Sequence, residues 1–83
     1  MRRASRTISA RIHRLNGQLG AIEHMVQKKR SCAEVLNQIS AVRAGLERVA
    51  VIVFQRELQK LAAAKKLNDF AVEKLSQAFS KTT

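Results

Sequence analysis

Residues 31–64 read SCAEVLNQISAVRAGLERVAVIVFQRELQKLAAA, and this stretch decides the fold. Ser31 and Glu34 have the Ser-x-x-Glu spacing of a capping box, which predicts that a helix begins at Cys32. Apolar residues then recur at alternating intervals of four and three, the period of one helix face: Val35, Ile39, Val42, Leu46, Val49 and Val53. The stretch therefore predicts one long helix over residues 32–64.

This helix is too long for a compact monomer. About 30 residues at 1.5 Å each give a rod of about 45 Å, whereas a compact chain of 83 residues has a diameter of roughly 30 Å. Residues 50–54 (Ala-Val-Ile-Val-Phe) are apolar all round, which indicates burial on every side. We therefore expect the helix to pack against copies of itself in a homo-oligomer.

Two further helices flank the long one. Over residues 5–27 the same alternation recurs, in the stripe Ile8, Ile12, Leu15, Leu19, Ile22 and Val26. Residues 65–67 form a short connection, and Asn68 is the expected N-cap of a third helix over residues 68–80. The prediction is an all-α protomer of three helices with one long central helix, forming a single domain over residues 1–83.

The net charge of +10 is concentrated near the N-terminus. Residues 1–30 contain eight basic residues and one glutamate. This uneven distribution of positive charge favours a polyanionic partner. DNA is favoured over RNA because no aromatic surface for stacking bases is evident. The alternative interpretation is a basic tail that is simply solvated. Arg11 flanks the apolar stripe, and the other candidate arginines of this helix fall on the opposite side: Arg2, Arg3, Arg6 and Arg14.

Gly17 and Gly20 lie inside the first predicted helix, where a glycine costs up to ~1 kcal/mol relative to alanine. Two explanations are open. Either a phosphate backbone or another helix comes close to these positions, or the helix tolerates them.

Cys32 is the only cysteine and follows the basic triplet at residues 28–30. In the first turn of a helix, unpaired backbone N–H groups and nearby cations favour thiolate over thiol. A small buried hydrophobe is the alternative interpretation. A single cysteine excludes an intrachain disulfide and fits a reducing compartment, so we expect a cytoplasmic location. No apolar run has the length of a membrane span, and the basic N-terminus lacks the apolar region of a secretory signal.

Glu57 lies on the same helix face as Cys32, at a heptad position where an apolar residue is expected. Glu57 either has a functional role or is exposed to solvent at a frayed helix end. The two residues are 25 positions apart, which is about 37 Å along a straight helix, so they cannot meet within one chain. They could meet where two copies of the helix pack antiparallel, which would make the site intersubunit. His13 and His24 are about 16 Å apart along their helix, cannot share an ion and are expected to face solvent or DNA.

Three stretches resemble a known signature: residues 11–18 (RIHRLNGQ), Cys32, and residues 38–43 (QISAVR). They are similar to the CsoR/RcnR/FrmR repressors, the copper-, nickel/cobalt- and formaldehyde-responsive repressors of bacteria. The resemblance covers residues 11–61 without gaps. It implies a three-helix protomer, an antiparallel dimer, and a tetramer (a dimer of dimers) that binds operator double-stranded DNA without a helix-turn-helix.

The same resemblance implies roles for individual residues. The DNA-contact positions of the family fall on Arg11 and Arg48, and DNA is released when an inducer binds between subunits. Cys32 matches the central thiol of the family. Glu57 occupies a position that is usually histidine, and Leu61 one that is cysteine in copper sensors or histidine in nickel/cobalt sensors.

These departures leave the inducer open. A soft Cu(I) site needs more sulfur or imidazole than these positions supply. In nickel/cobalt sensors an N-terminal histidine is a ligand, and its position would precede Met1 here. Persulfide sensors use two cysteines, whereas this chain has one. The formaldehyde sensor uses the amine of an N-terminal proline, but here Met1 is followed by Arg2. The sensor prediction is therefore Cys32 with Glu57, acted on by a transition metal ion (Cu(I), Ni, Co or Zn) or by a small electrophile such as formaldehyde.

Two functions compete. The first is a transcriptional repressor released from its operator by an inducer at Cys32, and the second is a non-sensing DNA-binding or nucleoid-type structural protein. A repressor should favour its operator over random DNA by at least ~10³. An enzyme is not expected, because the sequence has no Cys-x-x-Cys, His-x-x-x-His or Gly-rich phosphate loop and no credible Ser/His/Asp order.

Overall fold

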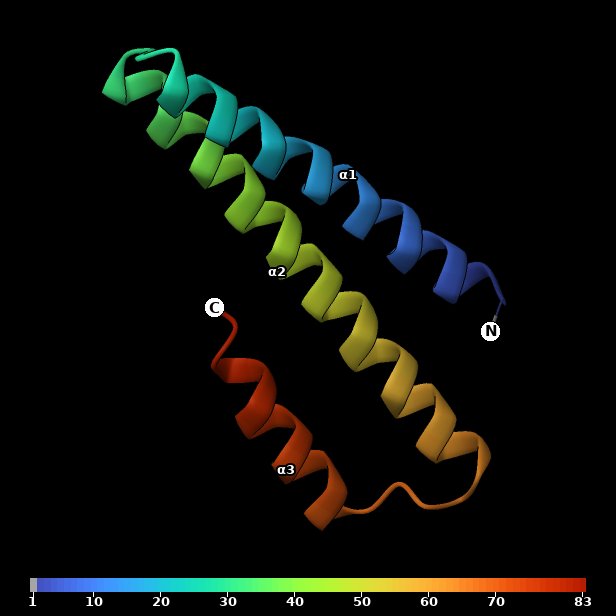
Figure 1. The fold of residues 1–83 in the computed structure, drawn as a ribbon. Coiled ribbons are helices and arrows are strands. Elements are labelled where there is room, and N and C mark those ends of the chain that lie inside the picture. Colours follow the sequence, from blue (N-terminus) through green and yellow to red (C-terminus); the bar gives the residue numbers. More distant parts are fainter. Residues whose placement is uncertain (1) are drawn as a thin grey trace. The chain divides into compact units, whose positions relative to one another are not determined.

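The computed structural model describes the backbone of residues 2–83 and the side chains of residues 7–83. Over this part of the chain it contains three α-helices and no strand: α1 (Arg2–Gln27), α2 (Cys32–Ala63) and α3 (Asp69–Ser80) (Figure 1). The predicted all-α class with a long central helix is confirmed. Helix α1 begins at Arg2 rather than near Ser5, because residues 2–4 are Arg-Arg-Ala, all good helix formers.

The start of α3 is fixed by its N-cap. Asn68 has an extended backbone, and its Oδ1 accepts a hydrogen bond from the Ala71 N–H at 2.8 Å. This bond satisfies one of the backbone donors that every helix leaves unpaired in its first turn. The predicted cap is confirmed, and the connection before it is non-helical as expected.

Helices α1 and α2 end in the same way, with a lysine in the left-handed region. After α1, the Lys29 N–H donates to the Val26 carbonyl at 3.1 Å and the Arg30 N–H donates to the Met25 carbonyl at 2.9 Å, which is a Schellman motif. Lys29 has φ 55°, and Lys65 repeats the conformation after α2 with φ 57°. This position usually holds glycine, because a side chain in the left-handed conformation costs about 1 kcal/mol.

The chain divides into two compact units, Met1–Leu46 and Glu47–Thr83. In the first unit α1 runs antiparallel to the N-terminal part of α2, and in the second α3 runs back along the C-terminal part of α2 (Figure 1). The single domain expected over residues 1–83 stays a prediction.

Among the glycines, Gly45 has a close neighbour on the other helix of the first unit. Leu15 of α1 and Val42 of α2 are 6% and 7% exposed, and no other apolar side chain in residues 7–83 is buried. A Cβ atom added at Gly45 would lie 2.6 Å from Leu15 Cδ2. Glycine at this position therefore lets the buried Leu15 side chain pack directly against the α2 backbone. Gly17 and Gly20 have no such neighbour within 4 Å, so no other helix of the described chain explains them.

Much of each predicted apolar stripe is uncovered in the single chain. Several stripe residues of α1 and α2 are exposed: Ile12, Leu19, Val26, Ile39, Leu46 and Val53. Residues 50–54, expected to be buried on every side, are half-buried or exposed. In the second unit the rings of Phe54 and Phe79 stack at a centroid distance of 4.8 Å, beside an apolar groove of about 320 Å³. The chain on its own does not complete the burial that its sequence predicts.

Candidate DNA-binding face and thiol site

The predicted DNA-binding arginines are divided between the two units. Arg11 and Arg14 lie on α1 in the first unit, and Arg48 lies on α2 in the second. Arg11 is half-buried, whereas Arg14 and Arg48 are exposed. The backbone of α1 includes Arg2, Arg3 and Arg6, but the structure does not describe their side chains. Their role in DNA binding therefore stays a prediction.

These arginines are not neutralised by acidic neighbours. Over residues 7–83, no carboxylate forms an ion pair with Arg11, Arg14 or Arg48. A guanidinium group without a carboxylate partner keeps its charge and its hydrogen-bond donors available for phosphate oxygens. This is the arrangement that a nucleic-acid contact needs.

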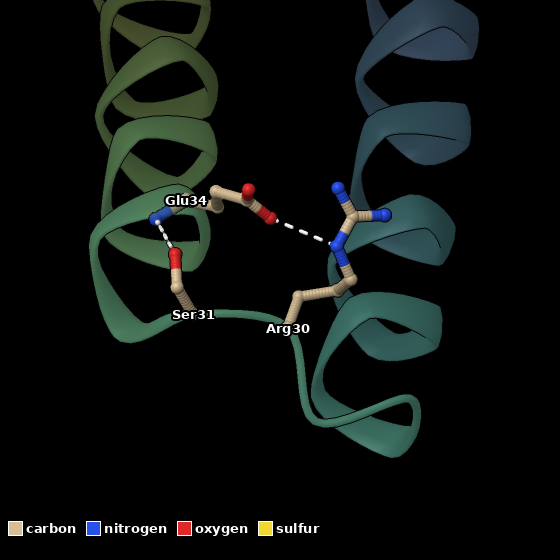
Figure 2. A network of polar contacts seen from close by, with 3 residues as sticks. All are labelled: Arg30, Ser31 and Glu34. Carbon is tan, nitrogen blue, oxygen red and sulfur yellow. Dashed lines mark hydrogen bonds and ion pairs between the residues drawn. The ribbon is translucent and has the colours of Figure 1, made fainter.

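Cys32 is the first residue of α2. Figure 2 shows the polar contacts among Arg30, Ser31 and Glu34 at this helix start. Ser31 Oγ accepts a hydrogen bond from the Glu34 N–H at 3.2 Å, which is one half of the predicted capping box. The Glu34 carboxylate does not turn back to the Ser31 N–H but accepts from Arg30 Nε at 2.8 Å. Both partners are about half exposed, so the pair contributes ~0–1 kcal/mol. The helix begins at Cys32 as predicted, and one cation of the preceding triplet is already paired.

Cys32 is exposed, which excludes the interpretation of a hydrophobe buried within its own chain. Glu57 is half-buried, and α2 continues beyond it to Ala63, so it does not lie at a frayed helix end. Both residues belong to α2 but to different units. Leu61, at the other position where the resemblance expects a ligand, is half-buried.

Metal-ligating side chains do not gather around Cys32 in the described part of the chain. Within the part of the chain that the structure describes, no group of three or more His, Cys, Asp or Glu side chains could hold a metal ion. His13 and His24 are exposed, as expected. The intersubunit site at Cys32 stays a prediction.

Sequence reasoning missed Gly45 and Gln18. It singled out Gly17 and Gly20, which face open space, whereas the tight contact occurs at Gly45. The available signal was the position of Gly45, three residues after Val42 on the apolar face of the long helix. Gln18 was quoted only as part of the resemblance, and it is half-buried in the structure.

None of the helices in the described part of the chain is both long enough and apolar enough to cross a membrane.

Comparison with known proteins identifies the class. A family model described as "Metal-sensitive transcriptional repressor" matches residues 4–81. The chain therefore belongs to the family of metal-sensitive transcriptional repressors, which are regulators rather than enzymes. It is 35% identical over 79 residues to the copper-sensing transcriptional repressor CsoR of Bacillus subtilis (strain 168), a match that covers 92% of this chain and 78% of the relative. No solved structure matches the chain. The resemblance found in the sequence is confirmed.

Proposed function

We propose that this protein is a DNA-binding repressor that leaves its operator when an inducer acts at Cys32. Family membership supplies the class. The observation that carries DNA binding is that Arg11, Arg14 and Arg48 have no carboxylate partner among the described residues, in a chain of net charge +10. Neutralising phosphates with such side chains releases counterions, which drives binding to duplex DNA.

The working form is a homo-oligomer, an antiparallel dimer that assembles into a tetramer. Only two apolar side chains in residues 7–83 are buried, Leu15 and Val42, so one copy leaves much of its apolar stripes exposed. The first unit also has an apolar groove of about 390 Å³, lined by Leu19, Ile22, Ile39, Val42, Arg43 and Leu46. A second copy of the same helices would cover this groove, which supports the intersubunit packing that the family resemblance implies.

Cys32 is the point at which the inducer acts. Its exposure in the single chain makes the thiol accessible. The Bacillus subtilis relative is a copper sensor, but Cys32, Glu57 and Leu61 together supply only one sulfur and no imidazole, which does not suit Cu(I). The inducer is therefore a metal ion that accepts oxygen ligands, such as Ni, Co or Zn held with Glu57 of a second copy, or a small electrophile such as formaldehyde.

A non-sensing DNA-binding protein is the second candidate. It is favoured by one observation, that no three metal-ligating side chains come together in residues 7–83. The two candidates differ in selectivity, because a repressor must prefer its operator over random duplex by at least ~10³. In either case a cytoplasmic location stays a prediction.

The test combines a footprint with native mass spectrometry. The full chain is footprinted on the DNA next to its own gene, with and without copper(I), nickel, cobalt, zinc or formaldehyde, and the mass of the oligomer is measured under each condition. We expect a protected site that is lost with one inducer, and a mass increase from that inducer. In Cys32→Ala the protection should persist in the presence of the same inducer. Equal affinity for operator and random duplex at matched salt would refute the repressor function. If the inducer released the Cys32→Ala variant from DNA as it releases the wild type, Cys32 would not be the sensing residue.

A further inference from the structure

One charged side chain lines the apolar groove of the first unit. The groove has a volume of about 390 Å³, and Arg43 is the one charged residue among those that line it. Ile39 and Leu46, which lie four residues before and three residues after Arg43 on the same face of α2, are 45% and 55% exposed. Whatever covers this groove must therefore bury apolar side chains and also accept hydrogen bonds from a guanidinium group.

A carboxylate lies one helical turn further along α2. Glu47 follows Arg43 by four residues within the helix Cys32–Ala63, so the two side chains are neighbours on one helix face. Each of them already has an interaction within its own chain. A guanidinium group has five N–H donors and an ionised carboxylate has about four acceptor sites, so each side chain can also take a second partner.

These opposite charges distinguish two ways of pairing α2 with the same helix of a second copy about a two-fold axis. In a parallel pair each residue faces its own counterpart, so Arg43 faces Arg43 and Glu47 faces Glu47. In an antiparallel pair whose axis passes position 45, Arg43 of each copy faces the partner subunit's Glu47. Like charges that face each other across an interface are costly, whereas complementary charges fix its orientation and register. The charges therefore favour the antiparallel pair.

A second pair of residues requires the same axis. The midpoint between positions 43 and 47 is position 45. The midpoint between Cys32 and Glu57, the pair of the proposed intersubunit site, lies between positions 44 and 45. The two midpoints differ by about half a residue, less than ~1 Å along a helix. One antiparallel register therefore brings both pairs together.

We propose that Arg43 and the partner subunit's Glu47 form two symmetry-related ion pairs that fix the antiparallel register of the dimer. This inference rests on the proposed function and deepens it, because it names the residues that align the second copy and so place Cys32 beside the partner subunit's Glu57. Apolar stripes with a seven-residue period also fit after a slip of seven residues, so apolar packing alone does not define one register. Such a slip would separate Arg43 from that carboxylate by about 10 Å.

Charge reversal in the full chain tests this pairing. Arg43→Glu places carboxylates opposite each other in a homodimer, and Glu47→Arg does the same with guanidinium groups, so each variant alone should dimerise at least about tenfold more weakly than the wild type. In a heterodimer of the two variants every facing pair is opposite in charge. Within each variant chain, however, positions 43 and 47 have like charges. Rescue on mixing therefore requires pairs between subunits and does not follow from a pair within one chain.

Native mass spectrometry of an equal mixture measures the fraction of heterodimers. If each homodimer is about tenfold weaker, heterodimers make up about 90% of all dimers, against about half for random mixing. The matched control mixes Arg30→Glu with Glu34→Arg. These residues form an ion pair at the same spacing of four and do not line the groove. The control mixture should show the random proportion.

The outcomes separate the ion pairs from the proposed function. If the wild type is oligomeric and the reversed variants mix at random, the ion pairs are wrong and the oligomer stands. If the wild type is monomeric, the oligomer of the proposed function fails and the ion pairs fail with it. A variant that is not helical alone by circular dichroism is refolded from urea together with the other variant. Recovery of helical heterodimers supports the pairing, and a mixture that stays unfolded overturns it.

Discussion

Replacing Gly45 by alanine tests whether the contact with Leu15 sets the packing of the first unit. Any glycine-to-alanine change inside a helix gains up to ~1 kcal/mol of helix propensity. At Gly45 the new methyl group would lie 2.6 Å from Leu15 Cδ2, well inside the ~3.5–4.0 Å optimum for two carbons. Leu15 is 6% exposed but lines a cavity of about 120 Å³, so its terminal methyl group must shift and has space to do so. Overpacking costs about 1–3 kcal/mol, and the shift of one side-chain end belongs at the low end of this range, about 1 kcal/mol.

Gly17→Ala is the matched control. It adds the same methyl group inside α1, with nothing within 4 Å. The propensity gain is common to both variants, so the difference between them isolates the packing cost. We expect Gly17→Ala to raise the free energy of unfolding by about 0.5–1 kcal/mol, and Gly45→Ala to be less stable than Gly17→Ala by about 1 kcal/mol.

Urea unfolding followed by circular dichroism measures both values. All variants are compared at one protein concentration, because the stability of an oligomer depends on it. A Leu15→Val background removes the Cδ atoms, so the penalty at Gly45 should shrink there, as a double-mutant cycle would reveal. Equal stability of the two alanine variants would refute the reasoning, and an undiminished penalty in the valine background would show that Leu15 is not its source.

Three further predictions concern the helix ends and the DNA face. Lys29→Gly should raise the free energy of unfolding by about 1 kcal/mol, because the lysine has φ 55°; lower stability in urea would contradict this. Asn68→Ala should lower it by about 1 kcal/mol through loss of the hydrogen bond to Ala71, and unchanged unfolding would show that the cap is dispensable. Arg48→Ala should weaken duplex binding and reduce the salt slope by about one; an unchanged slope would remove Arg48 from the DNA face.

The helices themselves could be predicted because their boundaries depend on neighbours within about four residues. Ser31 and Asn68 are N-cap residues whose side chains accept hydrogen bonds from backbone N–H groups three residues ahead. The alternation of apolar residues at intervals of four and three identified the faces of α1 and α2. The family could also be predicted, because residues 11–18 and Cys32 carry its signature at fixed spacing.

The site was less predictable, because it depends on which atoms of separate helices meet. The spacing of Ser31 and Glu34 predicted a reciprocal capping box, but the Glu34 carboxylate pairs with Arg30, a competing partner four residues away. Glu57 could be placed on the face of Cys32 by periodicity, but neither a ligand nor a partner for it could be derived. The sensing role of this pair stays a prediction, because it needs contacts that one chain does not contain.

The sequence by itself determined three helices, the N-caps at Ser31 and Asn68, the excess of positive charge and the family, since all of these depend on local spacing or composition. The tertiary structure alone decided that the Leu15 side chain packs against α2 at Gly45, and that Arg11 Nε is buried without an acceptor among the described residues. The physical reason is the register between α1 and α2. Periodicity shows which face of each helix is apolar, but the packing of the two faces decides which side chains touch and which cavity remains between them.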